Sequence, residues 1–159
     1  MRGWGFLDRA APLPLRSAVV NYRGLLVVVS AVQLATGVAG HVLALRRRLS
    51  YDIAVLNWRG DPEHMARESL CLGTALSAPV AMLATQAVAT ARLARGDSRV
   101  AQRTLGVLGA AMAPGYLVER TGRAALAPGR WDSLVTPVVV AGTGLATAMA
   151  GLGLRRSTQ

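Results

Sequence analysis

Residues 24–45 read GLLVVVSAVQLATGVAGHVLAL, and these 22 residues contain no Asp, Glu, Lys or Arg. Two further runs without a formal charge are residues 69–91, SLCLGTALSAPVAMLATQAVATA, and residues 133–154, SLVTPVVVAGTGLATAMAGLGL. At 1.5 Å per residue, helices of these lengths reach the roughly 30 Å of a bilayer's hydrocarbon core. The three runs therefore predict membrane-spanning helices.

A fourth apolar run, residues 104–118, has only 15 residues. It reaches across the bilayer as a helix over 100–118 if the long side chain of Arg103 extends to the headgroups. The alternative is a re-entrant or interfacial segment, which leaves three spans. We expect one all-α domain, an integral membrane bundle of four transmembrane helices over about 24–45, 69–91, 100–118 and 133–154.

The composition favours the same class of protein. Hydrophobic residues make up 52% of the 159 residues and aromatic residues only 4%, and the mean hydropathy is +0.37. The formal charge of +10 is typical of nucleic-acid-binding proteins. However, all 18 basic residues are Arg, and they lie between the apolar runs, where anionic lipid headgroups bind them. We therefore expect a lipid bilayer as the partner and no nucleic acid. The absence of Lys indicates a GC-rich genome, and a bacterial source is a hypothesis on the same ground.

The arginines also predict an orientation. The short loop 92–103 carries four Arg against one acidic residue, so the positive-inside rule places it in the cytoplasm. Both termini then lie on the cytoplasmic side of the plasma membrane, and the connection 46–68 becomes an outer loop. The difference between the sides is small, because the inner segments carry 10 Arg and the outer segments 8.

Two features predict how the helices associate. Small residues recur at every fourth position of the second span, which lets a neighbouring backbone approach closely: Gly73, Ser77, Ala81, Thr85 and Ala89. Two amides, Gln33 and Gln86, need hydrogen-bond partners in hydrocarbon, so we expect both to face the bundle. The amides then join helices by hydrogen bonds, and contact with a substrate is the alternative.

The outer loop 46–68 holds most of a polar cluster. Asp61-Pro62-Glu63 is typical of a helix start, and a helix running from it into the second span brings several polar side chains near one face. With a histidine at the outer end of the first span, the cluster comprises His41, Asp61, His64, Glu68 and Cys71. Such residues suit a transition metal or a proton relay. Capping, solvation and packing also explain each of them separately.

The sequence contains no phosphate-binding loop, nucleophile elbow or HExxH motif, and no cofactor is predicted. We expect a non-enzymatic accessory or interaction protein that packs against a second copy of itself or another membrane protein. One alternative is a metal- or redox-handling protein or enzyme that uses the outer cluster. Another is a small solute channel or carrier, although the lack of charged residues in the three long runs argues against ion transport.

Overall fold

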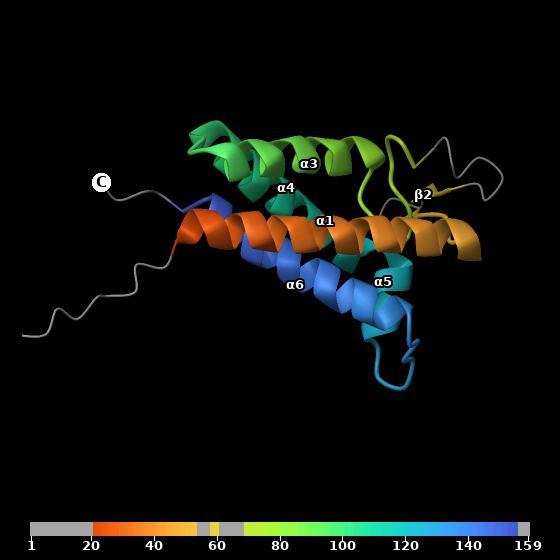
Figure 1. Cartoon of the computed structure of the whole chain (residues 1–159). Coiled ribbons are helices and arrows are strands. Elements are labelled where there is room, and N and C mark those ends of the chain that lie inside the picture. The colour runs from red at the N-terminus through yellow and green to blue at the C-terminus, as the bar shows by residue number, and fades with distance from the viewer. Residues whose placement is uncertain (1–20, 54–57, 61–68, 156–159) are drawn as a thin grey trace, which may run out of the picture.

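The fold is all-helical apart from one pair of two-residue strands, in a computed structural model that describes residues 21–53, 58–60 and 69–155. The elements within this part of the chain, shown in Figure 1, are α1 (Tyr22–Arg47), β1 (Asp52–Ile53), β2 (Trp58–Arg59), α3 (Val80–Arg95), α4 (Arg99–Val118), α5 (Arg120–Leu126) and α6 (Val135–Gly153). The two strands pair antiparallel, with Asp52 opposite Arg59.

The four long helices form a bundle with α1 in contact with both α3 and α6, and α4 packs on α3 and most extensively on α6 (Figure 1). The short helix α5 follows α4 and packs against α6 at one end of the bundle. At the other end, the guanidinium of Arg155 lies 5.2 Å from the centre of the Tyr22 ring. Both ends of the described chain therefore lie at the same end of the bundle.

Helices α1 and α6 are long and apolar enough to cross a membrane. The side chain of Asn21 starts α1 by accepting the N–H of Gly24 at 3.0 Å. Asp132 starts α6 in the same way, because one carboxylate oxygen accepts two N–H groups of the first turn at 2.9 Å each. Helices α3 and α4 are not long and apolar enough to cross a membrane by the same measure. Helix α3 has only 16 residues, and α4 carries Arg99 and Arg103 in its first turns.

The helix predicted over 69–91 begins only at Val80, because residues 69–79 form a folded turn segment. Gly73 has a φ of +82°, a left-handed conformation that a glycine adopts without strain. Pro79 has no backbone N–H and disfavours helical geometry in the residue before it. The chain therefore enters α3 directly after Pro79, and the predicted continuous helix through residues 69–79 into α3 is wrong.

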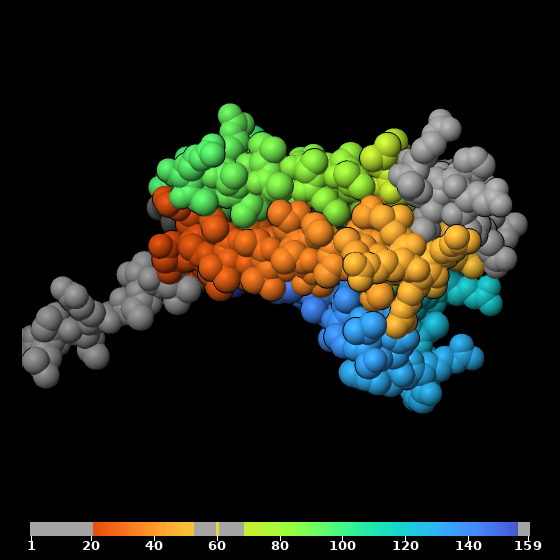
Figure 2. Space-filling view, turned by 45° about the vertical axis from the view of Figure 1, so that its right-hand side comes forward, coloured from red at the N-terminus to blue at the C-terminus, as the bar shows by residue number. Residues whose placement is uncertain are grey.

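The interior of the bundle is partly polar, whereas its exterior is largely apolar. Gln33 and Gln86 are fully buried, but Val28, Val88 and Val107 are each about 60% exposed (59%, 61% and 59%). Figure 2 shows α1 open along one face of the molecule, between α3 and α6. The core itself is mainly apolar, so the unusual features are the buried amides and the large apolar side chains exposed along the helices.

The closest helix contact joins α4 to α6 through glycines. A Cβ atom added to Gly109 would lie 2.5 Å from the carbonyl oxygen of Ala146, and one added to Gly153 would lie 2.5 Å from Cα of Gly106. These positions have no room for a side chain, so the two backbones touch. The glycines at this α4–α6 contact lie outside the stripe predicted from the sequence.

Candidate functional site

A buried cluster of polar side chains joins α1 to α3. The amide nitrogen of Gln86 donates to the Gln33 side-chain oxygen and to the backbone oxygen of Ser30, both at 2.8 Å. The hydroxyl of Thr90 donates to the Ser30 hydroxyl at 3.0 Å, and the Gln33 amide nitrogen lies 3.6 Å from the sulfur of Met112 on α4. The two amides lie inside the bundle and link three helices.

The predicted stripe of small residues is divided between two environments. Gly73 and Ser77 are buried, but both belong to the turn segment before α3. On the helix itself, Ala81 and Thr85 are exposed, and only Ala89 is buried. Within a single copy of the protein, the stripe does not lie along a helix–helix contact. Its first two residues precede α3, because this helix begins only at Val80.

The predicted outer cluster is only partly within the described residues, because Asp61, His64 and Glu68 lie outside them. His41 lies on α1 with its Nδ1 atom buried and without a hydrogen-bond partner, and Cys71 is an exposed free thiol. Within residues 21–53, 58–60 and 69–155, no three His, Cys, Asp or Glu side chains are arranged to hold a metal ion.

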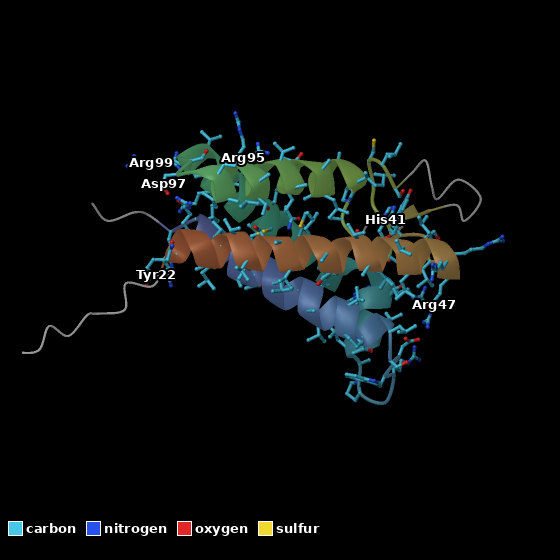
Figure 3. The ribbon with its side chains drawn as sticks, viewed as in Figure 1. Tyr22, His41, Arg47, Arg95, Asp97 and Arg99 are labelled. Carbon is cyan, nitrogen blue, oxygen red and sulfur yellow. The ribbon has the colours of Figure 1, made fainter. Side chains whose placement is uncertain are left out.

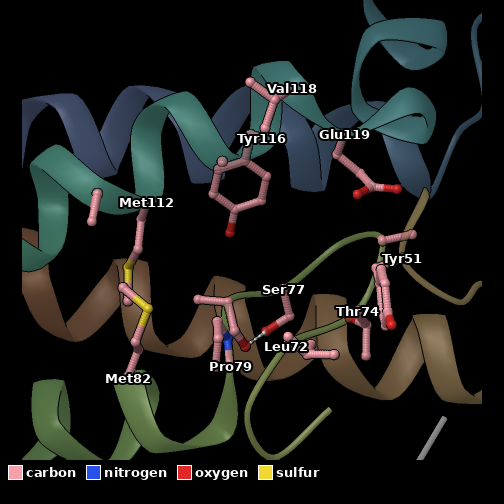
Figure 4. Close-up of a pocket in the computed structure, with 14 residues that line it drawn as sticks. Tyr51, Leu72, Thr74, Ser77, Pro79, Met82, Met112, Tyr116, Val118 and Glu119 are labelled. Carbon is pink, nitrogen blue, oxygen red and sulfur yellow. Dashed lines mark hydrogen bonds between the residues drawn. The ribbon is translucent and has the colours of Figure 1, made fainter. Parts of the chain in front are cut away.

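A cavity of about 130 Å³ lies between the end of α4 and the turn segment that precedes α3. Figure 4 shows the hydroxyl of Tyr116 pointing from α4 into this space, with the two thioethers of Met82 and Met112 at one side. Tyr51 and Glu119 line the opposite side. An apolar cavity of about 150 Å³ accommodates benzene, so the space suits a ligand of about six non-hydrogen atoms.

Two hydroxyl groups that line the cavity have no hydrogen-bond partner within the described chain. They are the Oη atom of Tyr116 and the Oγ1 atom of Thr74, on residues that are each only 6% exposed. A buried hydroxyl without a partner costs roughly 1–3 kcal/mol. Both oxygens are almost inaccessible as the side chains lie, so a ligand or water bonds to them only after the side chains that line the cavity shift. An occupant that does so recovers this free energy.

Glu119 adds a buried carboxyl group to the same cavity. It follows the last residue of α4 and is 6% exposed, and its Oε1 atom accepts the backbone N–H of Asp52 at 2.7 Å. The pKa of Glu119 is raised from 4.5 to about 7, mainly by burial. This net value includes a lowering by the hydrogen bond from the Asp52 N–H, a rise from the charge of Asp52 and a lowering by the charge of Arg123. The group therefore changes its charge near neutral pH.

The three polar groups of the cavity offer complementary chemistry to a donor-rich cation. An ionised Glu119 accepts hydrogen bonds and supplies a negative charge, while the hydroxyl oxygens of Tyr116 and Thr74 are two more acceptors. A primary ammonium group has three N–H donors and one positive charge. The side chains of Met82 and Met112 provide an apolar wall for a short alkyl chain.

Of the residues that line the cavity, Ser77 was predicted from the sequence as a helix-packing residue, but Tyr116, Thr74 and Glu119 were not predicted as site residues. Glu119 stands alone after an apolar run, and its partner Asp52 is 67 positions away along the chain. Its position gives no clear local signal, because Glu119 follows α4, where the helix dipole disfavours negative charge, and also directly precedes α5, where the dipole favours it.

No protein-family model, curated protein or solved structure matches this chain. The class defined by the fold is an all-helical protein with two helices able to cross a membrane. The function proposed below therefore depends on the geometry of the described residues.

Proposed function

We propose that this chain is an integral membrane protein in which α1, α3, α4 and α6 cross the bilayer, and that it acts as a non-enzymatic binding or accessory protein for a small primary amine. The observation that carries the proposal is the cavity at Tyr116, which combines a buried carboxyl group with two unpartnered hydroxyls. The amine binds as its ammonium cation to Glu119, Tyr116 and Thr74.

The distribution of apolar side chains supports the membrane location. In the most apolar window of α1 only 28% of the residues are buried, and in that of α6 only 33%. The core helix of a soluble protein is mostly buried, so an aqueous location would leave these surfaces in water. At about 25 cal/mol for each Å² of apolar surface, such exposure is costly in water and favourable among acyl chains.

The way α3 and α4 pack against the other two helices supports the proposal of four spans. Helix α3 covers only about 24 Å at 1.5 Å per residue, but the turn segment 69–79 continues its path. Residues 73–77 of this segment are buried in the protein, and non-helical backbone is tolerated at membrane depth in such a place. Arg99 and Arg103 reach the headgroups from the first turns of α4.

The proposed location is the plasma membrane, with both termini in the cytoplasm. Tyr22, Asp97 and Arg99 all lie at one end of the bundle (Figure 3), which matches the arginine-rich loop 92–103 assigned to the inner side. At the other end, Trp131 is 73% exposed, a position typical of the aromatic residues that lie at membrane interfaces.

The membrane location is tested by washing isolated membranes with alkaline carbonate, and we expect the protein to stay with the lipid. Ligand binding is tested by calorimetric titration of the purified protein in detergent with propylammonium. We expect binding at pH 8 and at least tenfold weaker binding at pH 5.5, where Glu119 is protonated. Tetramethylammonium has the same charge but no N–H donor, so it serves as the matched probe and should not bind.

Variants connect the binding to the cavity. We expect Glu119→Gln to abolish propylammonium binding and Tyr116→Phe to weaken it about tenfold, since one hydrogen bond to a charged group contributes about 1.5 kcal/mol or more. Tyr22→Phe and Asp97→Asn change the same kinds of side chain at the other end of the bundle and should have no effect. Equal binding of tetramethylammonium, or unchanged binding in Glu119→Gln, would contradict the proposal.

A second candidate function, a small solute carrier, is favoured by one contact. Met112 lines the cavity and also lies 3.6 Å from the amide nitrogen of Gln33, so the cavity adjoins the buried amides. Polar groups thus continue from the cavity towards the middle of the bundle. Uptake of radiolabelled methylammonium into proteoliposomes distinguishes a carrier from a binding protein, and Gln33→Leu should stop uptake while leaving binding at the cavity intact.

An interaction role is compatible with the binding function and uses another surface. Ala81 and Thr85 are exposed on α3, where a second copy or another membrane protein can approach the backbone. Crosslinking of Thr85→Cys in native membranes tests this contact. A crosslinked product that disappears in the Ala81→Leu background supports the interaction, and crosslinking that is unaffected by the larger side chain contradicts it.

A further inference from the structure

We infer that the opposite end of the bundle contains a second binding site, which takes the phosphate group of an anionic ligand. A cavity of about 430 Å³ lies there between the first turn of α1, the α3–α4 turn and the end of α6. Its polar rim includes Arg23 and Arg99, and its walls include Leu26, Leu93 and Leu152. This site is far from the amine cavity along the helices and does not depend on ligand binding at that cavity.

The charge at this end of the bundle is not neutralised by the protein itself. The α3–α4 turn has one carboxylate, Asp97, which pairs with Arg23 at 3.3 Å, and the two side chains are 90% and 41% exposed. An ion pair this exposed contributes little stability, so Arg23 can exchange Asp97 for another anion. Within the described residues, four further arginines of the turn have no ion pair: Arg92, Arg95, Arg99 and Arg103.

At the opposite end, Arg47 bonds to Asp132 at 2.7 Å and Arg120 lies 3.7 Å from Asp52. Other arginines at that end also have no ion pair within the described residues: Arg46, Arg48, Arg123 and Arg130. What distinguishes the α3–α4 end is that two of its arginines, Arg23 and Arg99, line the larger cavity. Figure 3 shows Arg95, Asp97 and Arg99 grouped at this end beside Tyr22.

Three features suit a phosphate group in particular. Arg23 and Arg99 approach the cavity from different helices, and guanidinium groups bind phosphate oxygens by paired hydrogen bonds. Ser98 caps α4, and the first turn of this helix lines the cavity, so the positive end of the helix dipole is directed to the same space. The guanidinium of Arg155 lies over the Tyr22 ring at the rim, 5.2 Å from its centre.

The leucine walls separate two sources of the phosphate. A free phosphate ion gains nothing from an apolar wall, whereas the glycerol and first methylenes of a phospholipid can bury apolar surface against the half-buried Leu152. Leu26 and Leu93 back this wall from the core. Basic pockets between transmembrane helices on the cytoplasmic side bind the headgroups of anionic lipids in this way. The shared chemistry is phosphate recognition, and the experiment has one arm for each source.

In the lipid arm, the intact protein is reconstituted into vesicles of phosphatidylcholine with 20% phosphatidylglycerol, and the retained lipids are counted by native mass spectrometry. In the ion arm, inorganic phosphate is added to the detergent-solubilised protein and its thermal midpoint is followed. We expect Arg23→Gln/Arg99→Gln to reduce retention of phosphatidylglycerol about tenfold and to leave phosphatidylcholine unchanged. The matched control, Arg46→Gln/Arg130→Gln, removes two charges at the other end and should retain the lipid.

Each outcome decides for or against the site. If Arg23→Gln/Arg99→Gln alone loses retained phosphatidylglycerol, the site binds a lipid phosphate. If inorganic phosphate raises the thermal midpoint of wild type but not of this double variant, the site binds a free phosphate ion. Equal loss in both pairs shows a general effect of charge and overturns the site, as does the absence of binding in both arms. If the double variant does not fold, the single change Arg99→Gln, at an exposed position, tests the site instead. We expect it to retain threefold to fivefold less phosphatidylglycerol than wild type.

Discussion

The charge of Glu119 couples the stability of the bundle to pH, and Glu119→Gln isolates this coupling. The pKa of this carboxyl is raised from 4.5 to about 7 because it is buried at the end of α4. Between these two pH values the native protein holds a proton that the unfolded chain releases, so stability falls as the pH rises through the window. At about 1.36 kcal/mol for each pH unit, the full loss is roughly 3 kcal/mol.

The glutamine variant keeps the carbonyl oxygen that accepts the N–H of Asp52 at 2.7 Å, but it has no charge to bury. We expect wild type and Glu119→Gln to differ by a constant amount below pH 4.5, and the variant to gain about 3 kcal/mol relative to wild type by pH 8. Circular dichroism during unfolding in mixed micelles, without amine present, measures this difference. Parallel pH curves for the two proteins would refute the reasoning, and Asp97→Asn, at an exposed carboxylate, supplies the control.

Three other substitutions test the packing. Gly109→Leu should prevent close contact between α4 and α6 and lower the thermal midpoint by more than 10 °C, whereas Gly144→Ala, at a position with nothing within 4 Å, should have little effect. Gln33→Leu and Gln86→Leu should each destabilise the bundle by about 1 kcal/mol, and a double-mutant cycle should give a coupling energy near 0.6 kcal/mol; additive losses would contradict a direct bond. Asp132→Ala removes the cap of α6 and should lower the thermal midpoint. Hydrogen bonds from backbone N–H groups lower the pKa of Asp132 from 3.8 to about 2. Wild type should therefore lose the same stabilisation only as the pH falls from 3.8 towards 2.

Local sequence patterns predicted a large part of the helical structure. The run 24–45 lies within α1, and α6 falls within the run 133–154. Long apolar stretches specify helices because every backbone group then bonds within the segment, and this requirement depends only on neighbouring residues. The helix predicted over 100–118 corresponds to α4, with Arg103 in its second turn, although α4 is not among the helices apolar enough to cross a membrane.

The segment 69–79 shows why an uncharged run does not specify one helix. Its hydropathy satisfies the requirement for a span, but Gly73 and Pro79 redirect the backbone, and both residues were visible in the sequence. The sequence did not show how the rest of the bundle makes room for this turn. Leu76 in this turn is fully buried, and a Cβ atom on Gly40 would collide with its carbonyl oxygen, so α1 leaves space for the turn.

The cavity at Tyr116 was beyond prediction for a related reason. Its lining residues come from three separate stretches of the chain, and the hydrogen bond from Asp52 to Glu119 crosses 67 positions. A single sequence gives no information on such pairs. The predicted polar cluster was based on one continuous helix into the second span, and the break before Val80 removes that geometry.

The contact between Tyr22 and Arg155 has a practical consequence for how this topology is studied. Since the two ends of the described bundle adjoin, a short linker can join them. New ends can be opened at Gly96, where an added Cβ atom would have no neighbouring atom within 4 Å. The circularly permuted chain would be synthesised in the order α4, α5, α6, α1 and α3. Recovery of the same bundle from that chain would show that helix packing, rather than the order of insertion, determines the arrangement.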